Sequence, residues 1–501
     1  MDDRGIYQSS LATRIATLVH AHFDALPARC KPRSRPDGTN EWIPMSGIVL
    51  AKGDAPEKLT CVAIATGARC LYASQIPQCR GLVLHDSHAE ILALRALNLW
   101  LINECMAVLR EEQEAKVGKV DQSHMSERFV RRRQDRSEND HWPPFELCSD
   151  VKIYMYCTCC PCGDASMELC MAAQDDPTPW EMSAEFSDAD PEAWKLAGRA
   201  NFSILGVVRR KPARADAEPS LSKSCSDKLS LRQVMSILSY PASLLVAPTE
   251  NAYITGLIMP EDEINSSGCS RAFGMSGRMK SLAGKFWLGD SAGRYGYRFR
   301  PFEILSVPSA IAKRIWPYRK PHPDEICQAE GRKPPKPGNI SAVWIASNNR
   351  KVEHSYDRDH MKWNIRLNSE TTGVLENIIS GVKQGNKYAT VTPRGASALS
   401  RAKLWDSVLN VFQFLKDMED SCEESSDWLG ILQAQTYAEF KRPQLADNHR
   451  LRLFYDARAS ALRDVRQVLR PWPPNHGDES WSRVEVLTDP KAQKTRIESS
   501  Q

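Results

Sequence analysis

The chain has 501 residues, of which 42% are hydrophobic and 26% charged, an ordinary composition for a globular protein with a sizeable core. Its length allows several average domains or one large one. The formal net charge is only +4, which excludes general polyelectrolyte binding, so any surface that binds nucleic acid must be local.

Fifteen cysteines are scattered along the chain and cluster only between residues 157 and 162. Their number is odd, no secretory signal opens the sequence, and we find no run of about 18 apolar residues that would cross a bilayer. We therefore expect reduced cysteines and an intracellular protein, nuclear or cytoplasmic, that does not contact a membrane.

The N-terminal part predicts one helix and two strands. Apolar residues recur at helical spacing in residues 6–29 and indicate a helix that ends before Pro27. Apolar and β-branched residues at 48–51 and 61–66 indicate strands. The turn Thr66-Gly67-Ala68-Arg69-Cys70 follows the second strand directly.

The next segment, His85-Asp86-Ser87-His88-Ala89-Glu90, has a pattern suited to zinc chemistry. Ser87 is a suitable helix N-cap, and the apolar periodicity continues to Leu109. The His88 imidazole could bind zinc, while the Glu90 carboxylate could move protons on a water activated there. His85 is an alternative ligand. A His-x-Glu triplet is weakly specific by itself.

Two segments have the composition of surface insertions. Residues 112–147 are charged, poor in apolar residues and contain Arg131-Arg132-Arg133. We interpret them as a disordered or solvated loop, or alternatively as a contact to a nucleic-acid backbone. Residues 174–191 are acidic and contain prolines, so we expect no such contact there.

Residues 151–156 predict a buried strand that leads into Cys157-Thr158-Cys159-Cys160-Pro161-Cys162. Pro161 suits a turn before a second helix, whose N-terminus would favour the thiolate of Cys162. His-x-Glu followed by Pro-Cys, each opening a helix, is the pattern of zinc-dependent deaminases. Ala165 replaces the second cysteine of Pro-Cys-x-x-Cys, so a third ligand must come from elsewhere, and Cys225 is the candidate.

A structural cysteine cluster is the main alternative. Cys157 and Cys160, and likewise Cys159 and Cys162, have the spacing of a zinc knuckle. They directly follow a predicted strand, however, where alternate side chains point in opposite directions.

Beyond the second insertion, residues 201–208 predict a strand. Four basic residues follow it around a rigid proline and suit phosphate binding: Arg209, Arg210, Lys211 and Arg214. Residues 229–238 indicate a helix, and residues 242–247 and 252–259 indicate strands.

The C-terminal third has helical patterns at 396–418, 426–441 and 448–469. Cations and phenols interrupt their apolar stripes. On the residues alone, amphipathic helices with snorkelling Lys and Arg side chains account for this pattern. The polar end, residues 481–501, is expected to be a disordered tail.

The motifs His88-Ala89-Glu90, Pro161-Cys162-Gly163 and Ser224-Cys225-Ser226-Asp227-Lys228, in this order, resemble the RNA adenosine deaminases. That family comprises the editing enzymes acting on double-stranded RNA and their tRNA-specific relatives. The resemblance extends over about residues 40–475. It implies that His88, Cys162 and Cys225 hold zinc and that Glu90 is the proton shuttle.

The resemblance also implies inositol hexakisphosphate, which the C-terminal region encloses in this family. A buried polyanion would supply the partners that inward-facing cations require. Leu94 and Leu231 replace two family arginines, so this pocket would be less basic. The positions that match its ligands are Arg95, Lys228, Arg401, Tyr437, Lys441, Tyr455 and Trp472, with Arg458 in place of a shifted lysine.

The resemblance further implies contacts with RNA. Arg69 lies in a turn that resembles the family's Ser-Thr-Gly-Thr-Lys-Cys. Arg332 and Lys336 precede Ser341-Ala342-Val343-Trp344, which resembles the family segment where an Arg and a Lys precede a Ser-Val-x-Trp strand. Residues 211–216 resemble Lys-Pro-Gly-Arg-Gly-Asp of the tRNA-type enzymes and not the longer base-flipping segment of the editing enzymes. No separate double-stranded RNA-binding module is expected before residue 48.

These observations predict an α/β fold: a cytidine-deaminase-like mixed sheet carrying two zinc-bearing helices, extended by a helical C-terminal region. Residues 1–480 would form a single domain. The predicted reaction is conversion of adenosine to inosine in tRNA, at the position 3′ of the anticodon in alanine tRNA. A small-molecule substrate is not expected, and the oligomeric state is open.

Three other functions are left open. An enzyme editing double-stranded RNA would share the chemistry. A cytidine or free-nucleoside deaminase would be shorter and would carry Pro-Cys-x-x-Cys. A non-catalytic, zinc-stabilised RNA-binding protein would not need Glu90.

Overall fold

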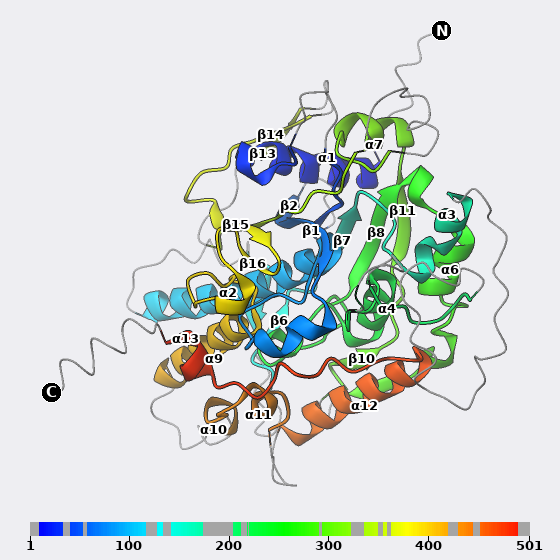
Figure 1. Ribbon diagram of the computed structural model, residues 1–501. Helices are drawn as coiled ribbons and strands as arrows, with labels where there is room; N and C mark the ends of the chain where they lie inside the picture. Colours follow the sequence, from blue (N-terminus) through cyan, green and yellow to red (C-terminus); the bar gives the residue numbers. More distant parts are fainter. Residues whose placement is uncertain are drawn as a thin grey trace.

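The structure is a computed structural model, in which the fold of most of the chain is defined (Figure 1). The described residues are 10–33, 41–53, 58–116, 128–133, 142–173, 204–211, 218, 220–289, 293–321, 335–348, 354–357, 362–418, 429–443 and 451–488.

A mixed sheet of eight strands forms the centre, in the order β11-β8-β7-β1-β2-β12-β15-β16. Neighbours among β11, β8 and β7 are parallel, and the remaining neighbours are antiparallel. The bounds are β1 (Met45–Lys52), β2 (Leu59–Thr66), β7 (Val151–Cys157), β8 (Ile254–Pro260), β11 (Glu303–Val307), β12 (Ser341–Ala346), β15 (Thr372–Ile379) and β16 (Val382–Lys383). Nearly continuous apolar runs form β1, β2 and β12 because both faces of these strands are covered.

Two long helices lie on opposite sides of these strands, α1 (Leu11–Asp24) and α2 (Ala89–Lys116) (Figure 1). Helix α1 approaches β1 closely at Gly47, where a Cβ atom would lie 2.5 Å from Cγ1 of Val19. Helix α2 packs against β1, β2 and β12.

Contrary to the expectation from sequence, α2 is long and apolar enough to cross a membrane. Its apolar window is 78% buried inside the fold, however, so we interpret α2 as a core helix.

Shorter elements surround the sheet. Four two-stranded sheets pair β3 (Ala68–Cys70) with β4 (Asp86–His88), β5 (Val130–Arg132) with β6 (Phe145–Leu147), β9 (Phe286–Leu288) with β10 (Gly296–Arg298), and β13 (His354–Asp357) with β14 (Lys362–Ile365). The helices here are α3 (Met167–Ala172), α4 (Cys225–Met235), α5 (Tyr240–Ser243), α6 (Ser266–Phe273) and α7 (Ser309–Ile315).

The C-terminal part packs helices against α2 and α4. Helix α9 contacts α2, α13 contacts α9, and α12 contacts α4 and the β9–β10 hairpin. Figure 1 shows these helices gathered below the sheet. Their bounds are α9 (Arg401–Met418), α10 (Leu429–Leu432), α11 (Tyr437–Lys441), α12 (Arg452–Val468) and α13 (Arg483–Leu487).

The strands predicted at 48–51, 61–66, 151–156 and 252–259 correspond to β1, β2, β7 and β8. Two strand predictions were wrong. Residues 242–247 contain the end of helix α5 and a turn. The described part of 201–208 is not a strand, because residues 209–211 pair locally with 220–224 instead.

The sequence predicted two surface insertions and a disordered tail, but the described parts of these segments pack against the fold. Helix α2 continues to Lys116, and the β5–β6 hairpin buries Val130 and Phe145 in the core. The segment 174–191 lies outside the described residues. The beginning of the predicted tail is ordered, because Trp481 is buried and α13 packs on α9.

Candidate active site

The His-x-Glu segment spans the junction between a short strand and a helix. Asp86-Ser87-His88 forms β4, whose register places His88 opposite Ala68 of β3. Helix α2 begins at Ala89, whose N–H donates to the Gly67 carbonyl (2.9 Å), and Glu90 lies in its first turn. The predicted N-cap at Ser87 was therefore wrong, because Ser87 belongs to the strand.

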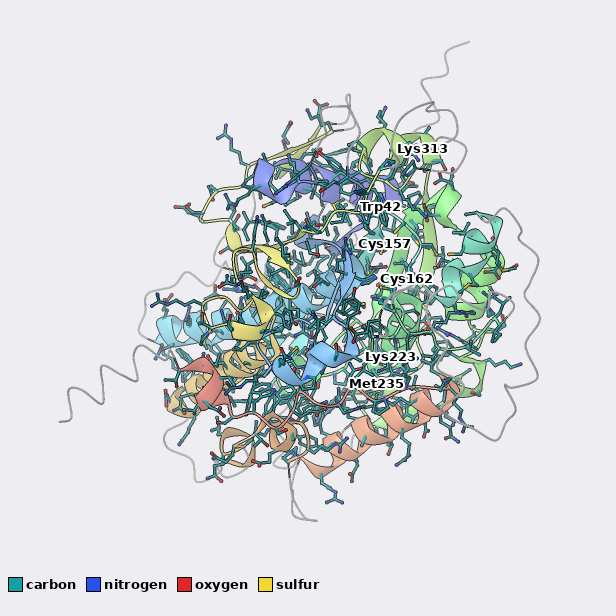
Figure 2. All side chains as sticks on the ribbon, viewed as in Figure 1. Trp42, Cys157, Cys162, Lys223, Met235 and Lys313 are labelled. Atoms are coloured by element: carbon teal, nitrogen blue, oxygen red, sulfur yellow. The ribbon has the colours of Figure 1, made fainter. Side chains whose placement is uncertain are left out.

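The two cysteine-bearing loops approach each other closely. Cys162 follows β7 and precedes a 3-10 turn, Asp164–Ser166, so the expected second helix begins only at Met167, as α3. Cys225 begins α4, whose N-cap Ser224 accepts a hydrogen bond from the backbone N–H of Asp227 (3.1 Å). The backbone N–H of Cys225 donates to Sγ of Cys162 (3.4 Å). Figure 2 shows Cys162 in the middle of the molecule.

A glycine permits this approach. Gly163 has φ +108°, a left-handed conformation that favours glycine, and a Cβ atom there would lie 2.1 Å from Oγ of Ser224. A larger residue would separate the two loops and so move Cys162 away from Cys225.

His88, Cys162, Cys225 and Glu90 lie together. A hydrogen bond from Cys225 lowers the pKa of Cys162 well below its usual value, and Lys211 and His88 add to this effect against burial. Burial and the neighbouring Cys162 raise the pKa of Cys225 well above its usual value. Burial and then Cys162 also raise the pKa of Glu90, which suits a group that accepts and returns a proton.

The donor set suits zinc. One imidazole and two thiols are typical of a catalytic zinc site with one position left open. Nδ1 of His88 bonds to Oδ1 of Asp86 (2.9 Å), which orients the ring and leaves Nε2 for a metal. The backbone N–H of Cys225 is bonded to Sγ of Cys162. In the described ranges, no three His, Cys, Asp or Glu side chains are spaced closely enough to hold a metal ion as they stand.

Asp86 connects this site to two lysines that the sequence did not associate with it. Its Oδ2 accepts from Nζ of Lys211 (2.9 Å), from Nζ of Lys228 and from Oγ of Ser222 (2.6 Å). Burial alone would raise the pKa of Asp86, but the two ammonium groups hold it well below its usual value. Nζ of Lys211 also lies 3.3 Å from Sγ of Cys225. The only sequence feature that could have indicated this network is the position of Asp86, two residues before His88.

A cluster of cations lies between this network and the C-terminal helices. Arg95 donates to the Leu399 carbonyl (3.0 Å), Arg401 pairs with Asp478 (3.0 Å), and Arg458 stacks over the ring of Tyr240 (5.0 Å). Burial and then Arg401 lower the pKa of Arg95 to about 10. In the part of the chain that is described, no carboxylate pairs with Arg95 or Arg458.

Other predicted members of this cluster lie around it. Tyr437 is buried, and Lys441 and Arg401 both lie over its ring (5.9 Å each). Lys441 has part of its surface in solvent, but burial of its amine and the nearby Arg401 lower its pKa to about 8. Tyr455 bonds to Tyr240 (3.2 Å).

Trp472 lies at the edge of the cluster under the ammonium of Lys223 (5.6 Å). Two further cations of this cluster, Lys223 and Arg232, point inward and were not predicted from the sequence. Burial and then Lys228 lower the pKa of Lys223 to about 7, and burial and then Arg458 lower the pKa of Arg232 to about 10. Figure 2 shows Lys223 below Cys162, on the side of the C-terminal helices.

The predicted RNA contacts divide into exposed and buried residues. Arg69 is exposed opposite Ser87, and Lys336 is exposed near Trp42. Arg209 and Lys211 are buried. The sequence predicted that these two side chains bind phosphate, but both turn to partners inside the protein. Arg209 donates to the Ile204 carbonyl (2.5 Å), and Nζ of Lys211 donates to Oδ2 of Asp86 (2.9 Å).

Of the three remaining predicted RNA contacts, the structure describes only Arg210. Arg210 is half-buried in a bridge with Lys223, while Arg214 and Arg332 lie outside the described residues.

The alternative ligands have other partners. Nε2 of His85 bonds to Oδ2 of Asp478 (2.8 Å), on the side of the cation cluster. Sγ of Cys157 lies 3.2 Å from Oγ of Ser46 on the neighbouring strand. Cys157 thus bonds to the neighbouring strand, and no hydrogen bond joins it to His88, Cys162 or Cys225 in the described part of the chain.

Comparison with known proteins agrees with this geometry. The chain is 35% identical over 300 residues to "tRNA-specific adenosine deaminase 1" of Schizosaccharomyces pombe, covering 60% of this chain and 69% of that protein. It is 35% identical over 237 residues to the protein of the same name from Saccharomyces cerevisiae, covering 46% and 54%. It is 22% identical over 314 residues to mouse "Double-stranded RNA-specific editase B2", covering 60% and 34%.

The chain therefore spans about two thirds of the first of these relatives and about half of the second. The sequence model of the family described as "Adenosine-deaminase (editase) domain" matches residues 63–451, which include His88, Glu90, Cys162 and Cys225. The chain belongs to the adenosine-deaminase (editase) domain family.

Proposed function

We propose that this protein is a zinc-dependent deaminase that converts adenosine to inosine in tRNA, at the adenosine 3′ of the anticodon in alanine tRNA. The observation that carries the proposal is the convergence of His88, Cys162 and Cys225 beside the buried Glu90. The names of the yeast relatives support tRNA as the substrate. An intracellular location follows from the substrate and remains a prediction.

Each residue of the candidate site has a role in the proposed reaction. His88, Cys162 and Cys225 would hold the zinc, which supplies a Lewis acid that makes water nucleophilic near neutral pH. Glu90 takes a proton from the attacking water and passes it to N1 of the adenine. The hydroxide attacks C6, and the hydrogen that it still carries then passes through Glu90 to the amino nitrogen. The C6–N bond breaks, ammonia leaves, and the C6 carbonyl of inosine, with a proton on N1, remains.

The environment of Glu90 supports this role. The carboxylate is 4% exposed, and its raised pKa brings it nearer to neutral pH, where it can both accept and donate a proton. Asp86 keeps the His88 ring in one orientation, so the two side chains stay on the same side of the site.

We also propose that inositol hexakisphosphate binds the cation cluster around Arg95, Arg401 and Arg458. Burial and then Arg401 lower the pKa of Arg95, and burial and then Arg458 lower the pKa of the neighbouring Arg232, as expected when like charges are enclosed without enough acidic partners. A polyphosphate would supply the missing negative charge through charge-assisted hydrogen bonds. Lys228 would connect this anion to Asp86 and hence to His88.

The decisive experiment incubates the zinc-loaded protein with three substrates: unmodified alanine tRNA transcript, a long RNA duplex and free adenosine. Inosine at one position next to the anticodon, with no product from the others, is the expected result. Inosine in the duplex would instead indicate an editing enzyme. No product from any substrate, with zinc bound, would indicate a structural zinc site and contradict the proposal.

A further inference from the structure

Tyr72 lies two residues after the end of β3, the strand that pairs with β4 and His88. The β3–β4 register places Ala68 opposite His88 and Cys70 opposite Asp86, and the N–H of Leu71 extends the pairing to the His85 carbonyl (2.9 Å). Tyr72 has an extended backbone, with φ −72° and ψ 157°. Because side chains alternate along an extended chain, Tyr72 lies on the same side as Ala68 and Cys70.

This side of the strand faces the active-site network. The Cys70 side chain contacts Ser220 and lies near Asp86 and Lys211. The backbone N–H of Ser74 donates to Oε1 of Glu218 (3.4 Å). Four residues of strand span roughly 13 Å. Tyr72 therefore lies within reach of a nucleotide that neighbours one held at His88.

The ring of Tyr72 is exposed although its backbone is anchored. Its side chain is 40% exposed, whereas Leu71 and Ile76 are buried in a small apolar cluster. The N–H of Tyr72 donates to Oε1 of Gln75 (3.0 Å). In the described part of the chain, Phe286 is the other large aromatic residue exposed to this degree, and it lies on the β9–β10 hairpin.

Exposed aromatic rings on a firm backbone, with cations nearby, are the features by which proteins bind single-stranded RNA through base stacking. Arg69 is an exposed cation of the same hairpin, on the opposite side of the strand from Tyr72 by the same alternation. We propose that Tyr72 stacks on a base adjacent to the target adenosine and holds the strand while the target enters the site. This inference rests on the proposed action on RNA.

The test measures kcat and KM on alanine tRNA transcript for wild type, Tyr72→Ala, Tyr72→Phe and Tyr72→Leu. Loss of one stacked base is expected to lower kcat/KM about 10-fold, mainly by raising KM. Tyr72→Phe should retain wild-type values, while Tyr72→Leu should resemble Tyr72→Ala. Phe286→Ala, which removes the other exposed ring, should have no effect.

Two further measurements separate stacking from other roles. The Tyr72→Ala defect should persist at high salt, whereas that of Arg69→Ala should shrink, because only the phosphate contact depends on counterion release. The thermal midpoint of Tyr72→Ala should equal that of wild type. Wild-type kinetics in Tyr72→Ala, an equal defect in Tyr72→Phe, or a lowered thermal midpoint would each overturn the inference.

The wild-type arm tests the proposed function separately. If the wild type deaminates the RNA duplex but not the tRNA, the tRNA proposal fails, and the variants are then compared on the duplex by the same criteria. Failure of the Tyr72 proposal leaves wild-type deamination of tRNA unchanged.

Discussion

The carboxylate of Asp86 bonds to Nδ1 of His88 through one oxygen (2.9 Å) and to Nζ of Lys211 through the other (2.9 Å). One buried acid thus orients the imidazole and neutralises a lysine that lies beside Cys225. Through Lys228, the same side chain also connects His88, the proposed zinc ligand, to the cation cluster.

Asp86→Asn should weaken zinc binding by about 10- to 100-fold, because the partner that orients a metal-binding histidine is lost. It should also destabilise the fold, since Lys211 would keep a buried charge without its acid. Zinc affinity, measured by competition with a chelator, tests the first effect. Asp150→Asn, at an exposed pair with Lys52, is the control, and equal zinc affinity in both variants would contradict the role of Asp86.

Glu90→Gln should keep zinc and thermal stability but lose turnover by about 10²- to 10⁴-fold, the usual contribution of a general acid–base group. Glu104→Gln is a matched control, because Glu104 is a buried glutamate of the same helix that contacts Asn348 (2.8 Å). Single-turnover inosine formation and bound zinc are measured together. Near-wild-type deamination by Glu90→Gln would contradict the role of Glu90 as the proton shuttle.

Cys162→Ser and Cys225→Ser should each lose bound zinc, since a serine hydroxyl is a far poorer zinc ligand than a thiolate. Cys157→Ser should retain it, because Cys157 contacts Ser46 and not the other ligands. Zinc per chain, measured by elemental analysis, distinguishes the two outcomes. Loss of zinc in Cys157→Ser with retention in Cys225→Ser would favour the structural cysteine cluster.

The cation cluster should give the ligand-free protein a characteristic dependence of stability on pH. Burial lowers the pKa of Lys441 from 10.5 to about 8, so between these values the unfolded chain binds more protons than the folded one. The free energy of unfolding should therefore rise with pH across this window and carry the full penalty below pH 8.

Inositol hexakisphosphate should raise the thermal midpoint at pH 7 and remove this dependence, because the bound anion favours the charged amine. Lys441→Met, a variant without the titrating amine, should have a weaker dependence even before the ligand is added. Thermal unfolding at pH 7 and pH 9, with and without the ligand, provides the measurement. Equal midpoints in all four conditions would exclude the polyphosphate from the cluster.

Lys228→Met should reduce activity and soluble yield together, because Lys228 bonds to both Asp86 and Ser222 (2.7 Å). Deamination rate and thermal midpoint are measured on the same preparation. Lower activity with an unchanged midpoint would show that Lys228 does not connect the cation cluster to the active site.

The sequence by itself identified the residues of the candidate site and predicted their chemistry. His88, Glu90, Cys162 and Cys225 could be selected because zinc ligands and a proton shuttle require particular residue types in short motifs. The strands β1, β2, β7 and β8 could be predicted for a similar reason, since buried strands require continuous apolar and β-branched residues.

Only the tertiary structure decided which cations serve the site and which face solvent. Lys211 and Arg209 belong to a basic run that suits phosphate contacts, yet the local pairing of residues 209–211 with 220–224 turns both side chains inward. Burial of a charge depends on the position of its partner, and Asp86 is 125 residues away from Lys211. No local pattern records a distance of that kind, so the fold alone could assign Lys211 to the active site.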